Sequence, residues 1–145
     1  MIKIICFGKI KERYLEEGIT DYLTRIRKYH KLEIIELKDD NNIIKEEQAL
    51  LKYINNSEYK IALDIKGKKI NSVDLASFID QRLMYDGNIT FIIGSSNGLS
   101  DSILNKVDYK MSFGDITMPH GLFRLVLLEQ IYRSFKILNN ERYHK

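Results

Sequence analysis

The feature that most constrains the fold is a regular alternation of short apolar runs with longer amphipathic stretches along the whole chain. The apolar runs are rich in isoleucine, which is typical of buried strands. They predict strands at Ile2–Phe7, Leu32–Leu37, Tyr59–Ile65, Ile89–Ile93 and Tyr109–Phe113. Apolar residues at helical spacing predict helices between them, over about 13–29, over 43–55, from Ser72 onward, after Gly98 and over 121–138. This order predicts an α/β fold, a mainly parallel sheet with helices on both faces.

The length and composition limit what kind of protein this can be. With 145 residues, the chain has room for one domain, 1–145. No apolar run reaches the roughly 20 residues of a membrane span, and the first one is too short for a signal peptide. One cysteine excludes an internal disulfide, and three histidines argue against a structural zinc site. We therefore expect a cytoplasmic protein with no metal and no membrane association.

Three of the predicted strands run into loops that contain glycine, at Leu63–Gly67, Gly94–Gly98 and Phe113–Pro119. In parallel sheets, ligands bind beyond the carboxyl ends of the strands. If these loops converge, they form a pocket made of backbone groups rather than charged side chains. The run Gly94–Gly98 is neither a P-loop nor a dinucleotide fingerprint. The alternative is that these are ordinary turns, with Pro119 in the first turn of a helix.

The last predicted helix is apolar around most of its circumference. Across Leu122–Ile131 only Arg124, Glu129 and Gln130 are polar, whereas a surface helix needs a single apolar stripe. The helix therefore needs a second cover, either another copy of the chain or further parts of its own chain. Arg124 and Arg133 lie about half a turn out of phase, so they cannot both face one ligand. One could act within its own subunit and the other across a dimer, or Arg133 could simply pair with Glu129.

The C-terminal tail, residues 139–145, is polar and basic and contains Arg142, Tyr143 and His144. Terminal residues usually fray, which is one interpretation. The other is functional, because these side chains can hold phosphate, stack on a base and exchange a proton near neutral pH.

Six segments, taken in order and at their spacing, resemble the ribosomal large-subunit RNA methyltransferase H family. They are Ile4–Lys9, Leu63–Lys68, Phe91–Leu99, Thr117–His120, Leu128–Arg133 and Tyr143–Lys145. Members of this family belong to the SPOUT class and methylate N3 of a pseudouridine in large-subunit ribosomal RNA. One departure is visible, since the family usually has two adjacent glycines where this chain has Gly94-Ser95.

The resemblance implies a C-terminal trefoil knot, a homodimer and S-adenosylmethionine as the methyl donor. It assigns cofactor binding to the same three glycine-bearing loops. By position, the residues are Leu63, Gly94, Phe113, Gly114, Asp115, Ile116, Thr117 and Met118.

The resemblance also suggests how the reaction is divided among the polar residues. We expect His144 to act as a base or hydrogen-bond relay, Tyr143 to stack on or orient the target base, and Arg133 and Arg124 to hold phosphate or stabilise negative charge. The tail is expected to complete the site of the partner subunit. RNA binding is assigned to Arg124, Arg142 and His120. Because the chain is small and its net charge is only +3, the expected substrate is the assembled ribosome. Two alternatives are a non-catalytic ribosome-associated or nucleotide-binding module, and a SPOUT methyltransferase that acts on another RNA.

Overall fold

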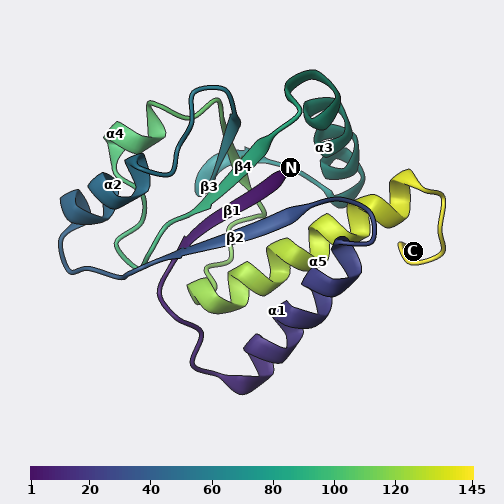
Figure 1. Ribbon diagram of the computed structural model, residues 1–145, viewed down its shortest axis with the longest axis horizontal. Helices are drawn as coiled ribbons and strands as arrows, with labels where there is room; N and C mark the ends of the chain where they lie inside the picture. The colour runs from purple at the N-terminus through teal and green to yellow at the C-terminus, as the bar shows by residue number, and fades with distance from the viewer.

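The computed structural model describes all 145 residues and contains one five-stranded sheet (Figure 1). Its strands are β1 (Ile2–Phe7), β2 (Leu32–Leu37), β3 (Tyr59–Lys69), β4 (Ile89–Ile93) and β5 (Tyr109–Ser112). They lie in the order β2-β1-β4-β3-β5, and every neighbouring pair is parallel. The predicted α/β class with a parallel sheet is therefore confirmed.

Helices cover both faces of the sheet, as predicted. The helices α1 (Arg13–Ile26), α3 (Ser72–Asp86) and α5 (His120–Leu138) share one core with the sheet. The helices α2 (Ile43–Leu51) and α4 (Asp101–Leu104) lie on the other face over a smaller core. The strand residues alternate between the two cores, because successive side chains point to opposite faces: Ile4 belongs to the first core and Ile5 to the second. No helix is long and apolar enough to cross a membrane.

Most of the apolar surface of the last helix is buried by other helices and strands of the same chain. α5 lies between α1 and α3 and against the sheet (Figure 1). Leu127, Leu128 and Ile131 are fully buried there. Leu122, at the start of the outer side, is 36% exposed. Burial inside one chain therefore explains most of the apolar circumference, and the homodimer stays a prediction.

β3 extends further than the sequence predicts. It continues past Ile65 to Lys69, and its pairing with β5 is interrupted by a bulge. Both Leu63 and Lys68 are in register with Met111, so the residues between them loop out of the ladder. A Cβ at Gly67 would lie 2.7 Å from the backbone carbon of Lys110, so only glycine fits where the bulge returns to β5. The bulge carries part of β3 toward the carboxyl edge of the sheet.

Candidate functional site

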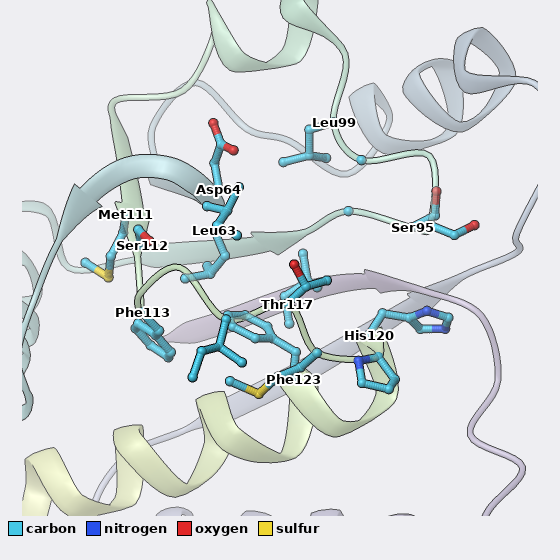
Figure 2. A pocket seen from close by; sticks show the side chains of 18 of the residues that line it. Leu63, Asp64, Ser95, Leu99, Met111, Ser112, Phe113, Thr117, His120 and Phe123 are labelled. Carbon is cyan, nitrogen blue, oxygen red and sulfur yellow. The ribbon is translucent and has the colours of Figure 1, made fainter.

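A cleft of about 610 Å³ opens where the bulge of β3 and the loops after β4 and β5 meet (Figure 2). Its volume falls within the roughly 300–1,000 Å³ of small-molecule sites. The three strands end side by side in the sheet, so their carboxyl ends bring together loops that are distant in the sequence. The first turn of α5 closes the cleft with His120 and Phe123. The three glycine-bearing loops therefore converge on one cleft, which was the condition for a pocket in the sequence analysis.

The loop after β4 is a tight turn that brings Gly94 and Gly98 into contact. The Gly98 amide donates to the Ser95 carbonyl at 2.9 Å, and Gly98 has a positive φ of 74°. A Cβ at Gly94 would lie 2.8 Å from the backbone carbon of Gly98. Any larger residue at position 94 would therefore push the turn out of place.

A buried carboxylate from α2 holds this turn from behind. The Ser95 hydroxyl donates to Glu46 Oε1 at 2.6 Å, and the Asn97 amide donates to Glu46 at 3.3 Å and to the Asp40 carbonyl at 2.9 Å. The Asp40 amide donates to Glu46 Oε2 at 3.0 Å. The structure thus accommodates a serine where the family usually has a glycine, because the Ser95 side chain bonds to Glu46.

Sequence reasoning missed Glu46, although a signal was present. Glu46 is 4% exposed and shares the inner side of α2 with Leu50. It stands at helical spacing between Ile43 and Leu50, where an apolar residue is expected. A carboxylate at such a position needs partners nearby.

The loop after β5 forms the opposite wall of the cleft. The Ser112 hydroxyl bonds to both the amide and the carbonyl of Gly114, at 3.1 Å each, and Gly114 has a φ of 124°. The Phe113 ring packs on Phe123 of α5 with centroids 5.5 Å apart. Pro119 caps α5, which begins at His120. These contacts fix both ends of the loop while its middle lines the cleft.

The lining is apolar with few charges. Half of the twenty lining residues are hydrophobic, and the titratable ones are Asp64 and His120. No lysine or arginine lines the cleft. Besides Asp64, His120 and the hydroxyl residues of the loops, the polar groups available to a ligand are backbone amides and carbonyls. No group of His, Cys, Asp and Glu side chains is arranged to hold a metal ion.

Seven of the eight residues predicted to bind the cofactor line the cleft: Leu63, Gly94, Phe113, Gly114, Ile116, Thr117 and Met118. Asp115 does not. Its carboxylate forms an exposed ion pair with Lys69 at 2.7 Å, on the far side of the loop. The structure adds Asp64, Ser95 and Leu99, which the sequence prediction did not include.

The predicted catalytic residues lie away from the cleft of their own chain. Tyr143 donates to Glu129 at 3.2 Å, and Glu129 is nine residues, or about 14 Å, along α5 from His120. Nδ1 of His144 lies 3.1 Å from a guanidinium nitrogen of Arg133, which is further still along the helix. The Arg133 guanidinium also lies over the Tyr143 ring, 4.7 Å from its centroid. The structure therefore brings the three residues together, but not at the cleft.

Ion pairing and burial fix the protonation of Arg133 and Tyr143 in this cluster. Arg133 pairs with Glu129 at 2.5 Å, as the i,i+4 spacing allowed, and the carboxylate raises the pKa of the guanidinium further. Burial raises the pKa of the Tyr143 hydroxyl well above its ordinary value, and bonding to Tyr22 and Glu129 adds to the shift. Tyr143 therefore keeps its proton at neutral pH.

The expectation that Arg124 binds RNA does not fit the structure. Arg124 is 2% exposed. Its guanidinium donates to Glu36 at 2.6 Å and to the carbonyls of Phe7 and Gly8 at 3.3 and 2.9 Å. These partners tie the start of α5 to the ends of β1 and β2, so the side chain has a structural role. Of the other two residues assigned to RNA, His120 lines the cleft and Arg142 is exposed in the tail.

Comparison with solved structures supports the fold. A probable methylase family protein from Haemophilus influenzae aligns with a TM-score of 0.57 at 13% identity, over 99% of this chain and 70% of that one. The TrmH/SpoU tRNA modifying enzyme of A. aeolicus aligns with a TM-score of 0.50 at 13% identity, over 95% and 77%. At this identity the likeness concerns the fold alone. The trefoil knot implied by the sequence resemblance stays a prediction.

Sequence comparison is more specific. Residues 1–144 match the family model described as "Predicted SPOUT methyltransferase". The chain is 47% identical to Ribosomal RNA large subunit methyltransferase H of Carboxydothermus hydrogenoformans and 46% identical to that of Malacoplasma penetrans. Each alignment covers 99% of both chains. The chain therefore belongs to the SPOUT methyltransferases, within the ribosomal RNA large subunit methyltransferase H family.

Proposed function

We propose that this protein transfers a methyl group from S-adenosylmethionine to N3 of a pseudouridine in large-subunit ribosomal RNA, with the assembled ribosome as substrate. The observation that carries the proposal is the meeting of three glycine-bearing loops in one cleft, in a chain whose full-length relatives are named for methylation of this RNA. The proposal goes beyond those names in the target atom and in the state of the substrate.

The cleft fits the methyl donor in size and in chemistry. Its apolar walls suit an adenine ring, and loop amides and carbonyls can bond to the ring edge and the ribose. Gly94 lets the backbone approach a ligand closely, and Asp64 offers a carboxylate to hydroxyl or amino groups. When bound, S-adenosylmethionine supplies a methyl group on a sulfonium, which is inherently transferable. The residues proposed to hold it are Leu63, Gly94, Phe113, Gly114, Ile116, Thr117 and Met118.

The acceptor side of the site is proposed to come from a second copy of the chain. The cleft has no lysine, arginine or tyrosine in its lining, and the cluster of Arg133, Tyr143 and His144 lies along α5 beyond reach. A homodimer that packs the outer side of α5 against its counterpart, where Leu122 is exposed, would bring each tail to the other cleft. Each site would then use a donor pocket from one chain and a tail from the other.

The target nitrogen belongs to an imide and must lose its proton before it attacks the methyl group. Arginine can only donate, so Nδ1 of His144 is the acceptor in its contact with Arg133. A neutral ring with this contact carries its proton on Nε2, so it presents a hydrogen-bond donor. This geometry favours the relay role: the imide proton passes to solvent water, and His144 and Arg133 stabilise the imide anion that remains. Tyr143 keeps its proton and positions the base.

The test has three measurements on the full-length protein. Calorimetry with S-adenosylmethionine measures donor binding, labelled-methyl transfer to ribosomes measures activity, and mass spectrometry of the RNA identifies the modified atom. We expect binding, transfer to ribosomes in preference to naked RNA, and a methyl group on N3 of a pseudouridine. Binding without transfer to any RNA would favour the non-catalytic module. Transfer to a different RNA or a different atom would contradict the assignment of the substrate.

A further inference from the structure

The end of the molecule away from the cleft has a surface of basic residues, here called the basic end. It joins residues 25–31, at the end of α1 and just beyond it, to residues 136–145, at the end of α5 and in the tail. Tyr29 holds the two segments together, since its hydroxyl donates to Glu141 at 2.8 Å and its ring stacks on Phe135. The two segments contain one acidic residue, Glu141, and seven basic ones: Arg25, Arg27, Lys28, Lys31, Lys136, Arg142 and Lys145.

Most of these charges have no acidic partner. Arg25 pairs with Asp21 and Lys136 pairs with Glu141. The other five are exposed and form no ion pair: Arg27, Lys28, Lys31, Arg142 and Lys145. The N-terminal amine lies within the field of the same lysine, because its pKa is lowered first by burial and then by the positive charge of Lys31.

The cleft has no comparable group of cations that could bind a nucleic acid. It contains no lysine or arginine, and its one carboxylate would repel phosphate. A target nucleotide, however, arrives with phosphates on both sides, and neutralising phosphates supplies much of the affinity of proteins for RNA. The cations that bind those phosphates must therefore lie outside the cleft.

We propose that the basic end binds the phosphate backbone of the RNA that flanks the target nucleotide. This rests on the proposed function, because it places the basic end beside the cleft of the partner subunit. The tail residues Tyr143 and His144 belong to the same end of the molecule as Lys28 and Lys31, through the contacts of Tyr29 and Phe135. A dimer that brings the tail to the partner's cleft brings these cations as well. The RNA then lies across both subunits.

The test compares two double variants of the full-length protein. Lys28→Ala with Lys31→Ala removes two free cations from the basic end. Lys45→Ala with Lys52→Ala removes two exposed, unpaired lysines from α2 and its C-cap, on the opposite face, and is the matched control. Binding is measured against salt concentration, with ribosomes and with a naked large-subunit RNA fragment. A third variant, Lys28→Arg with Lys31→Arg, keeps the charges.

We expect the slope of log affinity against log salt to fall by about 1.4–1.8 in the Lys28/Lys31 alanine variant, on both substrates. The KM for ribosomes should rise with little change in kcat, donor affinity should stay the same, and the arginine variant should behave like the wild type. The α2 control should keep the wild-type slope.

Equal slopes for the two alanine variants would overturn the inference. A loss seen with ribosomes and absent with naked RNA would also overturn it, because the partner of the basic end would then be a ribosomal protein. These binding measurements need no catalysis. If the wild-type protein transfers no methyl group, the proposed function fails while the basic end is still judged by its salt slope.

Discussion

The two ends of α5 are built differently, and an arginine marks each of them. At the cleft end, Arg124 is buried and bonded to Glu36 and to two backbone carbonyls. At the tail end, Arg133 is partly exposed and holds Glu129, Tyr143 and His144 through side chains alone. The cleft end is fixed to the sheet by its own chain, whereas the tail end is a cluster of polar side chains that lies away from the cleft.

This difference suggests a division of labour along one helix. A donor site benefits from a rigid, preformed cleft, since positioning supplies much of the acceleration in a transfer reaction. An RNA-facing site needs exposed hydrogen-bond donors and aromatic rings that meet a substrate arriving from outside. The chain places the first kind of site at the start of α5 and the second at its end.

The strongest test of this division is to delete Tyr143–Lys145. Without these residues, methyl transfer to ribosomes should fall by at least about 100-fold, the lower range for loss of a donor that stabilises a developing anion. Donor binding should be unchanged, because the loops and the start of α5 form the donor cleft and the tail is proposed to supply only the acceptor side. The measurements are labelled-methyl transfer and calorimetry with the donor. Full activity after the deletion would remove the tail from the mechanism.

Mixing two inactive proteins tests whether the tail acts on the partner's cleft. One is the tail deletion, and the other is Gly94→Val, whose side chain displaces the Gly94–Gly98 turn and should abolish donor binding. Mixed dimers contain one site with an intact cleft and an intact tail, so activity should reappear on mixing. If mixing restores no activity, the intact cleft of one chain cannot use the tail of the other. The tail would then serve the cleft of its own chain, and the proposed dimer would be wrong.

Replacement by methionine should affect mainly stability at Arg124 and mainly activity at Arg133. Arg124→Met should lower the free energy of unfolding by about 2–4 kcal/mol. Breaking a fully buried ion pair costs about 3–5 kcal/mol. The expected loss is slightly smaller here because Glu36 is partly exposed to water. Arg133→Met should lower it by about 1 kcal/mol or less and should instead reduce kcat. Denaturant unfolding and steady-state kinetics measure both effects.

The Arg124→Met variant also tests whether Arg124 has a structural role and no contact with RNA. If it has no contact with RNA, the salt dependence of ribosome binding should match the wild type in Arg124→Met, measured where the protein is folded. A shallower salt slope would restore Arg124 to the RNA-binding residues.

The local sequence pattern predicted most of the fold and most residues of the donor side of the site. Apolar runs separated by helical stretches predicted all five strands, and the rule for carboxyl ends selected the loops at Leu63, Gly94 and Phe113, which do meet in the structure. The sequence pattern did not indicate which way loop side chains point, or which side chains from distant segments form ion pairs. Asp115 faces Lys69 rather than the cleft, and Glu36 neutralises Arg124 from a distant strand. Neither pairing has a signature in the sequence, because each depends on which side chains the sheet order brings together.

Gly94→Ala tests how rigid the cleft end is. The added Cβ would lie 2.8 Å from the backbone carbon of Gly98, and a backbone atom yields less readily than a side chain. Donor affinity should fall by about tenfold or more, if the displaced turn removes a single well-made contact of about 1.4 kcal/mol. Gly87→Ala is the control, since it strains the C-cap of α3 and leaves the cleft intact. Equal donor affinity in both variants would mean that the turn is not held rigidly.

The smallest expected effect concerns the support behind that turn. Ser95→Ala removes a donor from the buried Glu46, which keeps its bonds to Asp40 and Asn97. The free energy of unfolding should fall by about 1–2 kcal/mol, because a hydrogen bond to a charged group is worth roughly 1.5–3 kcal/mol and the remaining donors compensate in part. Ser96→Ala is the matched control, since Ser96 is exposed and makes no side-chain hydrogen bond. In the Glu46→Gln background the further loss from Ser95→Ala should shrink, because the acceptor no longer carries a charge. If Ser95→Ala lowers the free energy of unfolding by the same amount in the Glu46→Gln background, Ser95 acts through packing. The turn would then be held by backbone contacts alone.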